Sequence, residues 1–102
     1  MCFPDPEAKV KPVQQLEVSG RSDSELTVSW DQYSCTDLPA RFLDFIPYIG
    51  HQREIDIDSL SARSFTFTGL QPITLYQLHV DVVVVKENEN TARSTVWACT
   101  RE

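Results

Sequence analysis

The sequence predicts an all-β fold, an antiparallel β-sandwich built from seven short strands. Apolar residues recur at every second position in most segments, which is the period of a half-buried strand. β-Branched and aromatic residues fill these positions, and polar turn segments separate the runs at regular intervals. No segment shows an apolar stripe at helical spacing, and 102 residues suffice for one core and therefore one domain.

The first two strands alternate cleanly between apolar and polar residues. Leu16 and Val18 alternate with polar neighbours until Gly20 ends the first strand. After a polar turn, the segment Leu26–Trp30 is apolar on one face and rich in hydroxyl groups on the other. Both segments are therefore expected to face a core on one side only.

Five further strands are expected at residues 42–49, 53–57, 64–70, 75–85 and 94–100. Gly50 marks the turn after the third strand, and Glu87–Asn90 supply turn residues between the last two. Pro47 lies inside the third strand and has no N–H to donate to the ladder. A bulge or an early end of the third strand is therefore expected at Pro47.

The charge and the hydropathy of the chain argue against two classes of function, nucleic-acid binding and membrane insertion. The chain has 15 acidic and 9 basic residues, a formal net charge of −6, which argues against nucleic acid because phosphate recognition needs a basic surface. No apolar run approaches the length of about 18 residues that spans a bilayer, so direct membrane insertion is not expected.

Pro4, Pro6 and Pro12 give residues 1–11 the character of an extended lead-in or linker, which leaves 12–102 for the domain. The first residues lack the basic start and apolar stretch of a secretory signal, and we expect a module excised from a longer protein.

The His, Asp, Glu and Cys residues do not show the spacing of a catalytic site or of a metal site. His79 and Asp81 share a strand face, but a zinc site needs three or four ligands, so a solvated strand face is expected. Glu54, Asp56 and Asp58 alternate with apolar residues at about 6.6 Å spacing, too far apart for one calcium ion, and favour a charged edge strand. The sequence has no phosphate loop, nucleophile elbow or Cys-x-x-Cys pair. We expect no enzyme activity, no cofactor and no metal.

Three pieces of the chain resemble a fibronectin type III domain. The first is the opening strand after Pro12, and the second is Leu26–Trp30, where the family places its core tryptophan, Trp30. The third and most specific is the segment 69–80, which matches the Leu-x-Pro-x-Thr-x-Tyr corner of the family. The resemblance covers about residues 10–102 and implies an immunoglobulin-like sandwich of fibronectin type III topology.

The corner has a physical reason in addition to the resemblance. Pro72 fixes the turn out of the fifth strand, and Leu70 closes the end of the core. Tyr76 is expected to bury its ring and to bond the backbone a few residues upstream through its hydroxyl. Trp30, Leu70, Pro72 and Tyr76 are therefore interpreted as structural residues.

The cysteines are Cys2, Cys35 and Cys99, an odd number, so at least one thiol is free or pairs outside this chain. The resemblance implies that Cys2 and Cys35 lie at one pole of the sandwich and Cys99 at the other. A Cys2–Cys35 disulfide is the preferred pairing, which leaves Cys99 for a contact with another chain. Three reduced thiols in an intracellular protein are the open alternative.

The same topology makes the third, sixth and seventh strands neighbours in one sheet. Alternation then turns five apolar side chains to the open face of that sheet, where they are expected to form one patch: Ile46, Tyr48, Val83, Val85 and Trp97. Exposed apolar patches mark interfaces, and Trp and Tyr are favoured anchors there. Coverage by a neighbouring domain or linker, or scattered exposure without a role, are the open alternatives.

The resemblance implies a non-catalytic protein-interaction or spacer module of a larger extracellular or cell-surface receptor or adhesion protein. Its partner would be another protein or a neighbouring domain of the same chain. Two alternatives remain open, an intracellular structural scaffold repeat and an accessory domain of an enzyme. An oxidised cysteine pair would favour the extracellular hypothesis, and reduced thiols the intracellular one.

Overall fold

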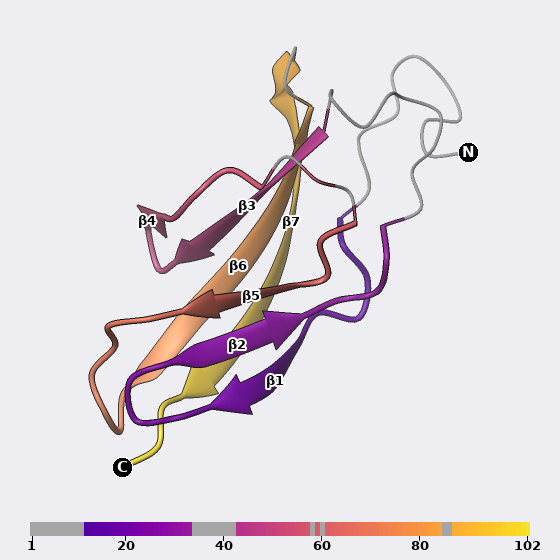
Figure 1. The fold of residues 1–102 in the computed structure, drawn as a ribbon. Coiled ribbons are helices and arrows are strands. Elements are labelled where there is room, and N and C mark those ends of the chain that lie inside the picture. Colours follow the sequence, from indigo (N-terminus) through magenta and orange to yellow (C-terminus); the bar gives the residue numbers. More distant parts are fainter. Residues whose placement is uncertain (1–11, 34–42, 58, 60, 85–86) are drawn as a thin grey trace.

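The computed structural model describes residues 12–33, 43–57, 59, 61–84 and 87–102, with the side chains of 43, 84 and 87–90 left out. In chain order the strands are β1 (Glu17–Arg21), β2 (Leu26–Ser29), β3 (Leu43–Ile49), β4 (Gln52–Arg53), β5 (Ser64–Phe67), β6 (Leu75–Val84) and β7 (Glu87–Cys99). They form a three-stranded sheet in the order β1-β2-β5 and a four-stranded sheet in the order β4-β3-β6-β7 (Figure 1). Every pairing is antiparallel, so the predicted β-sandwich is confirmed.

The core lies between the two sheets and follows the predicted alternation. Its fully buried side chains come from both layers: Leu26, Val28, Phe45, Phe67, Leu78, Val80 and Val82. The ring of Trp30 packs edge-to-face on that of Phe45, with 5.7 Å between the ring centroids. Because strand residues alternate between faces, the intervening positions of each strand point away from this core.

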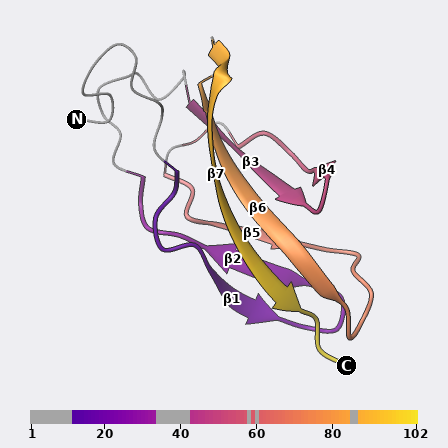
Figure 2. The same cartoon turned by 180° about the vertical axis from the view of Figure 1, so that it is seen from behind.

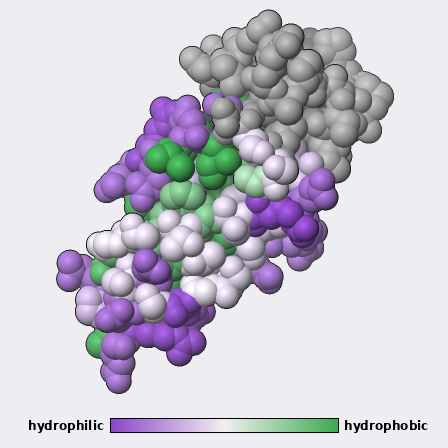
Figure 3. Space-filling model, in the orientation of Figure 1, coloured by the Kyte–Doolittle hydropathy of each residue, from purple (hydrophilic) through white to green (hydrophobic). Residues whose placement is uncertain are grey.

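The outer face of the three-stranded sheet is polar. The hydroxyl groups of Thr27 on β2 and Thr66 on β5 are hydrogen-bonded at 2.9 Å. In Figure 3 the surface over β1, β2 and β5 is mostly neutral or hydrophilic, and hydrophobic side chains gather instead over β3 and the segment after β4. The exposed side chain of Ile55 belongs to that segment.

Pro47 does not interrupt β3, so the expected bulge or early end is wrong. β3 pairs with β6 without a register shift through Pro47, which stands opposite Val80. The carbonyl of Pro47 accepts a hydrogen bond from the Glu54 N–H at 2.9 Å, so the side of Pro47 that lacks a donor faces β4. The missing N–H shortens β4, which ends at Arg53 instead of continuing to residue 57. One isolated bridge, between Phe45 and Ile57, follows.

The last hairpin also differs from the prediction. Glu87–Asn90 belong to β7 and not to a turn between strands. The register passes from Val83 opposite Thr91 to Val84 opposite Glu87, which leaves residues 88–90 as a bulge in β7. Seen from behind, β7 is the outermost strand of its sheet (Figure 2).

Candidate functional site

The candidate site is the open face of the four-stranded sheet. The register places Ile46 opposite Asp81 and Tyr48 opposite His79, with Arg93 and Thr95 next to these two on β7. Further along β6, Gln77 stands opposite Trp97. These residues alternate with the buried core residues, so they share the face that points away from the sandwich.

The structure separates the predicted patch residues by a polar centre. Ile46 is only 6% exposed, Tyr48 and Val83 are half-buried, and Trp97 is 59% exposed. Val85 lies outside the described residues. The polar side chains of β6 and their β7 partners stand between the β3 residues and Trp97, so the exposed apolar area on this face centres on Trp97.

The polar centre is an ion pair stacked on an aromatic ring. The Arg93 guanidinium donates to both carboxylate oxygens of Asp81, from Nε at 2.7 Å and from an Nη at 3.1 Å. Its central carbon also lies 4.8 Å from the centre of the Tyr48 ring, within cation–π range. The hydrogen bond to Asp81 raises the pKa of Arg93. The contact joins β7 to β3 across the intervening β6.

This bridge explains why His79 and Asp81 are almost fully buried, where a solvated face was expected. Tyr48 and Arg93 extend from the flanking strands over β6 and exclude water from its outward side chains. The Nδ1 of His79 lies 2.8 Å from the Thr95 hydroxyl. Burial is the largest cause that lowers the pKa of His79, and the nearby positive charge of Arg93 lowers it further. Both causes favour the neutral form of the His79 imidazole.

Sequence reasoning missed a second exposed apolar group, at the start of β6. Leu75 is 61% exposed and stands opposite the half-buried Cys99, diagonal to Trp97. Ile73 is 66% exposed and has a φ of 52°, in the left-handed region that β-branched residues rarely adopt. Leu75 has the same parity as Gln77, so the alternation in the sequence contained the signal for its exposure.

The corner before β6 is closed by hydrogen bonds. The Gln71 N–H donates to the Tyr76 hydroxyl at 2.9 Å. The Thr100 hydroxyl donates to the Gln71 carbonyl at 2.6 Å and accepts from the Thr74 N–H at 3.0 Å. Leu70 is half-buried against the core, and Pro72 is exposed with its carbonyl accepting a bond from the Thr74 hydroxyl at 2.9 Å. These bonds fix the start of β6 to the end of the chain.

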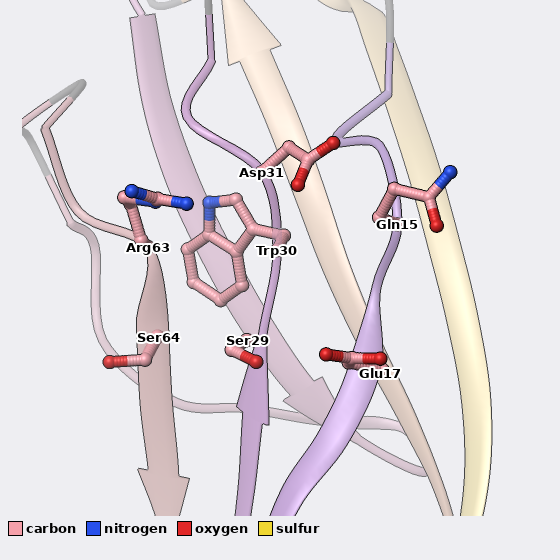
Figure 4. A pocket seen from close by; sticks show the side chains of 7 residues that line it. All are labelled: Gln15, Glu17, Ser29, Trp30, Asp31, Arg63 and Ser64. Atoms are coloured by element: carbon pink, nitrogen blue, oxygen red, sulfur yellow. The ribbon is translucent and has the colours of Figure 1, made fainter.

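A polar hollow of about 540 Å³ lies on the other sheet (Figure 4). Glu17, Ser29 and Ser64 form a row across β1, β2 and β5, and Asp31 and Arg63 stand at the upper end of the hollow. The buried indole Nε1 of Trp30 has no hydrogen-bond partner among the described residues. The lining is polar and carries charges of both signs, from Glu17, Asp31 and Arg63.

The described part of the chain contains no group of three or more His, Cys, Asp or Glu side chains that could hold a metal ion. Glu54 and Asp56 follow β4 instead of lying on a strand, and Asp56 forms an ion pair with Arg53. Asp58, Cys2 and Cys35 lie outside the described residues, and Cys99 is a free cysteine. No helix in the described ranges has the length and apolar character needed to cross a bilayer.

Comparisons with known proteins identify the family. A sequence model of the fibronectin type III domain matches residues 11–97. No curated protein matches the sequence. The solution structure of the third fibronectin III domain of human KIAA0343 protein is similar, with a TM-score of 0.69 and 16% identity over 98% of this chain and 89% of that chain.

Two longer proteins contain a similar domain. The chicken CNTN1 FN1–FN3 structure matches with a TM-score of 0.65 and 21% identity over 89% of this chain and 32% of that chain. The Yersinia enterocolitica family 28 exopolygalacturonase matches with a TM-score of 0.67 and 14% identity over 89% of this chain and 20% of that chain. This chain thus spans between a fifth and a third of the length of the chains in these two structures. Together with the two-sheet topology and the hydrogen-bonded tyrosine corner, the family match shows that the chain belongs to the fibronectin type III domain family.

Proposed function

We propose that this domain is a non-catalytic protein-interaction module of a larger extracellular or cell-surface receptor or adhesion protein. The observation that supports the proposal is the exposed Trp97 on the open face of the four-stranded sheet. Large aromatic side chains at that exposure are the usual anchors of protein interfaces. In this proposal residues 12–102 form the module, and residues 1–11 are a lead-in to it.

The binding surface we propose combines this anchor with the rigid polar centre beside it. The stack of Arg93 on Tyr48 and its two bonds to Asp81 hold these side chains in place before a partner arrives. A surface that is already ordered loses less side-chain freedom on binding. In this proposal Ile46, Val83 and Val85 belong to the margin of the same surface, and Cys99 contacts another chain.

Binding is tested with Trp97→Glu and with Ile55→Glu as a matched control, because Ile55 has the same exposed fraction of 59% on another part of the surface. Each purified variant is presented to an array of secreted and cell-surface ectodomains. The proposal expects an ectodomain that binds the original chain and the Ile55 variant but binds the Trp97 variant about tenfold more weakly. An array in which no ectodomain distinguishes the two variants contradicts it. Thermal unfolding of both variants checks that they are folded.

The extracellular setting is tested separately through the cysteines. The chain is prepared under oxidising conditions, alkylated without reduction and mapped by mass spectrometry. The proposal expects Cys2 joined to Cys35 and one alkylated thiol on Cys99. Three alkylated thiols would contradict the bridge and favour the intracellular scaffold, the setting in which thiols stay reduced.

A further inference from the structure

A groove lies at one end of the sandwich, at the border of the face that carries Trp97. It is a hollow of about 490 Å³ between the β3–β4 hairpin and the connection from β5 to β6. These two segments lie on the same side of the molecule in both views (Figures 1 and 2). Its volume falls within the range of about 300–1,000 Å³ that ligand sites occupy.

One wall of the groove is apolar and has a fixed base. Leu75 lines it with 61% of its surface exposed, beside the half-buried Ile49 and Leu70, which pack against the core. The Gly50 N–H donates to the Gln77 carbonyl at 2.7 Å, and the Leu70 N–H donates to the Ser24 carbonyl at 2.9 Å. These two bonds hold the β3–β4 hairpin and the β5–β6 connection in place, so the groove is formed before a ligand binds.

The opposite rim carries the carboxylate of Glu54. Glu54 lines the groove half-buried, and its side-chain contact is with the Gln52 amide, Nε2 to Oε2, at 3.5 Å. The neighbouring Arg53 is paired with Asp56 instead, and neither salt bridge of the described residues includes Glu54. With a formal net charge of −6 on the chain, this rim attracts a positive side chain.

β4 contributes Gln52 to the groove, and the segment directly after β5 contributes Thr68. Among the described residues β4 pairs with β3 and β5 pairs with β2, and each has a second edge whose backbone groups can pair with a further strand. Gln52 and Gln77 also line the hollow, and an amide side chain can both donate and accept a hydrogen bond. Free edges and amides match an extended backbone better than they match a compact small molecule.

We propose that this groove binds an extended peptide segment of a partner protein, with a large apolar side chain against Leu75 and a Lys or Arg side chain against Glu54. The groove adjoins the face proposed above, because Gln77 stands opposite Trp97, and its partner class is defined by the apolar wall and the Glu54 carboxylate. Glu54 lies outside the face that carries Trp97, so the effect of Glu54→Gln on the Lys peptides distinguishes binding at this groove from binding at Trp97.

The probe is an array of short peptides in which a Leu is combined with Lys, Gln or Glu at each nearby position. The original chain is expected to bind the peptides with Leu and Lys, and Leu75→Asp is expected to weaken this binding about tenfold. Glu54→Gln should weaken the Lys peptides about fivefold and leave the Gln peptides unchanged, because it removes only the charge. Glu17→Gln, on the other sheet, is the matched control for Glu54→Gln and should bind as the original chain does.

Two measurements keep the test independent of the fold of the variants. Backbone amide shifts of the original chain are recorded by NMR as the Leu-Lys peptide is added. Shifts at Gln52, Thr68 and Gln77 that leave Thr27 on the far sheet unchanged support the groove. Shifts elsewhere, no preference for Lys over Glu, or a dimer in sedimentation that Leu75→Asp disperses would overturn the proposal, the last because a second copy would then be the occupant.

Discussion

Removal of the Arg93 side chain is expected to destabilise the domain by about 2 kcal/mol. The carboxylate of Asp81 is 8% exposed and accepts two hydrogen bonds from Arg93, whose own side chain is 44% exposed. Breaking a fully buried pair costs about 3–5 kcal/mol, because the remaining charge stays buried, whereas an exposed pair contributes about 0–1 kcal/mol. One buried and one half-exposed partner place this pair between the two limits. The lost stacking on Tyr48 adds about 0.5 kcal/mol to the effect.

The assay is urea unfolding of four chains: the original, Arg93→Ala, Asp81→Asn and the double variant. The double variant should lose less than the sum of the single ones, with a coupling energy of about 1 kcal/mol. Arg63→Ala is the control, since Arg63 is exposed and should stay within about 0.5 kcal/mol of the original chain. An Arg93→Ala chain as stable as this control would refute the reasoning that the ion pair stabilises the outer face.

Three further predictions concern the corner before β6 and the buried histidine. Ile73→Gly should raise the free energy of unfolding by about 0.5–1 kcal/mol. The φ of Ile73 is 52°, and this left-handed conformation costs a β-branched residue about 1–2 kcal/mol, part of which is offset because glycine loses more chain entropy on folding. An unchanged urea midpoint would contradict the claim that Ile73 is strained. Tyr76→Phe should lower it by about 1 kcal/mol by removing the acceptor of the Gln71 N–H, and an unchanged free energy would show that water replaces that bond. Because burial lowers the pKa of His79 below its ordinary value of 6.5, the unfolded state binds the proton more readily. Stability should therefore fall as the pH drops below about 6.5, and His79→Gln should abolish that part of the slope in unfolding curves at several pH values.

The fold could be predicted from the sequence because its signals are local. Alternation through Val28 and Trp30 determines which face of β2 is buried, and the segment around Tyr76 identifies the corner without knowledge of distant contacts. The expected bulge or early end at Pro47 was wrong, because the effect of a missing N–H depends on which neighbouring strand that N–H would face. Here the neighbour is β4, and the register that shows it is not visible in the sequence.

The candidate site was less predictable because its exposure depends on side chains from three strands. Alternation places Asp81 on the outer face, but its burial follows from Arg93 and Tyr48, which are distant in sequence. Exposure at Leu75 was present in the alternation, whereas the groove beside it is formed by the β3–β4 hairpin and the connection from β5 to β6, which are distant in sequence. The partner role of the outer face stays a prediction.

The most direct test of the central proposal places the photo-reactive amino acid benzoylphenylalanine at position 97 in place of Trp97. The chain is applied to intact cells and illuminated, with the same amino acid in place of Ile55 as the control. If the open face of the four-stranded sheet is the binding surface, position 97 crosslinks a discrete cell-surface protein and position 55 does not. Equal crosslinking from both positions, or none from position 97, would contradict the proposal that this domain binds a protein through Trp97.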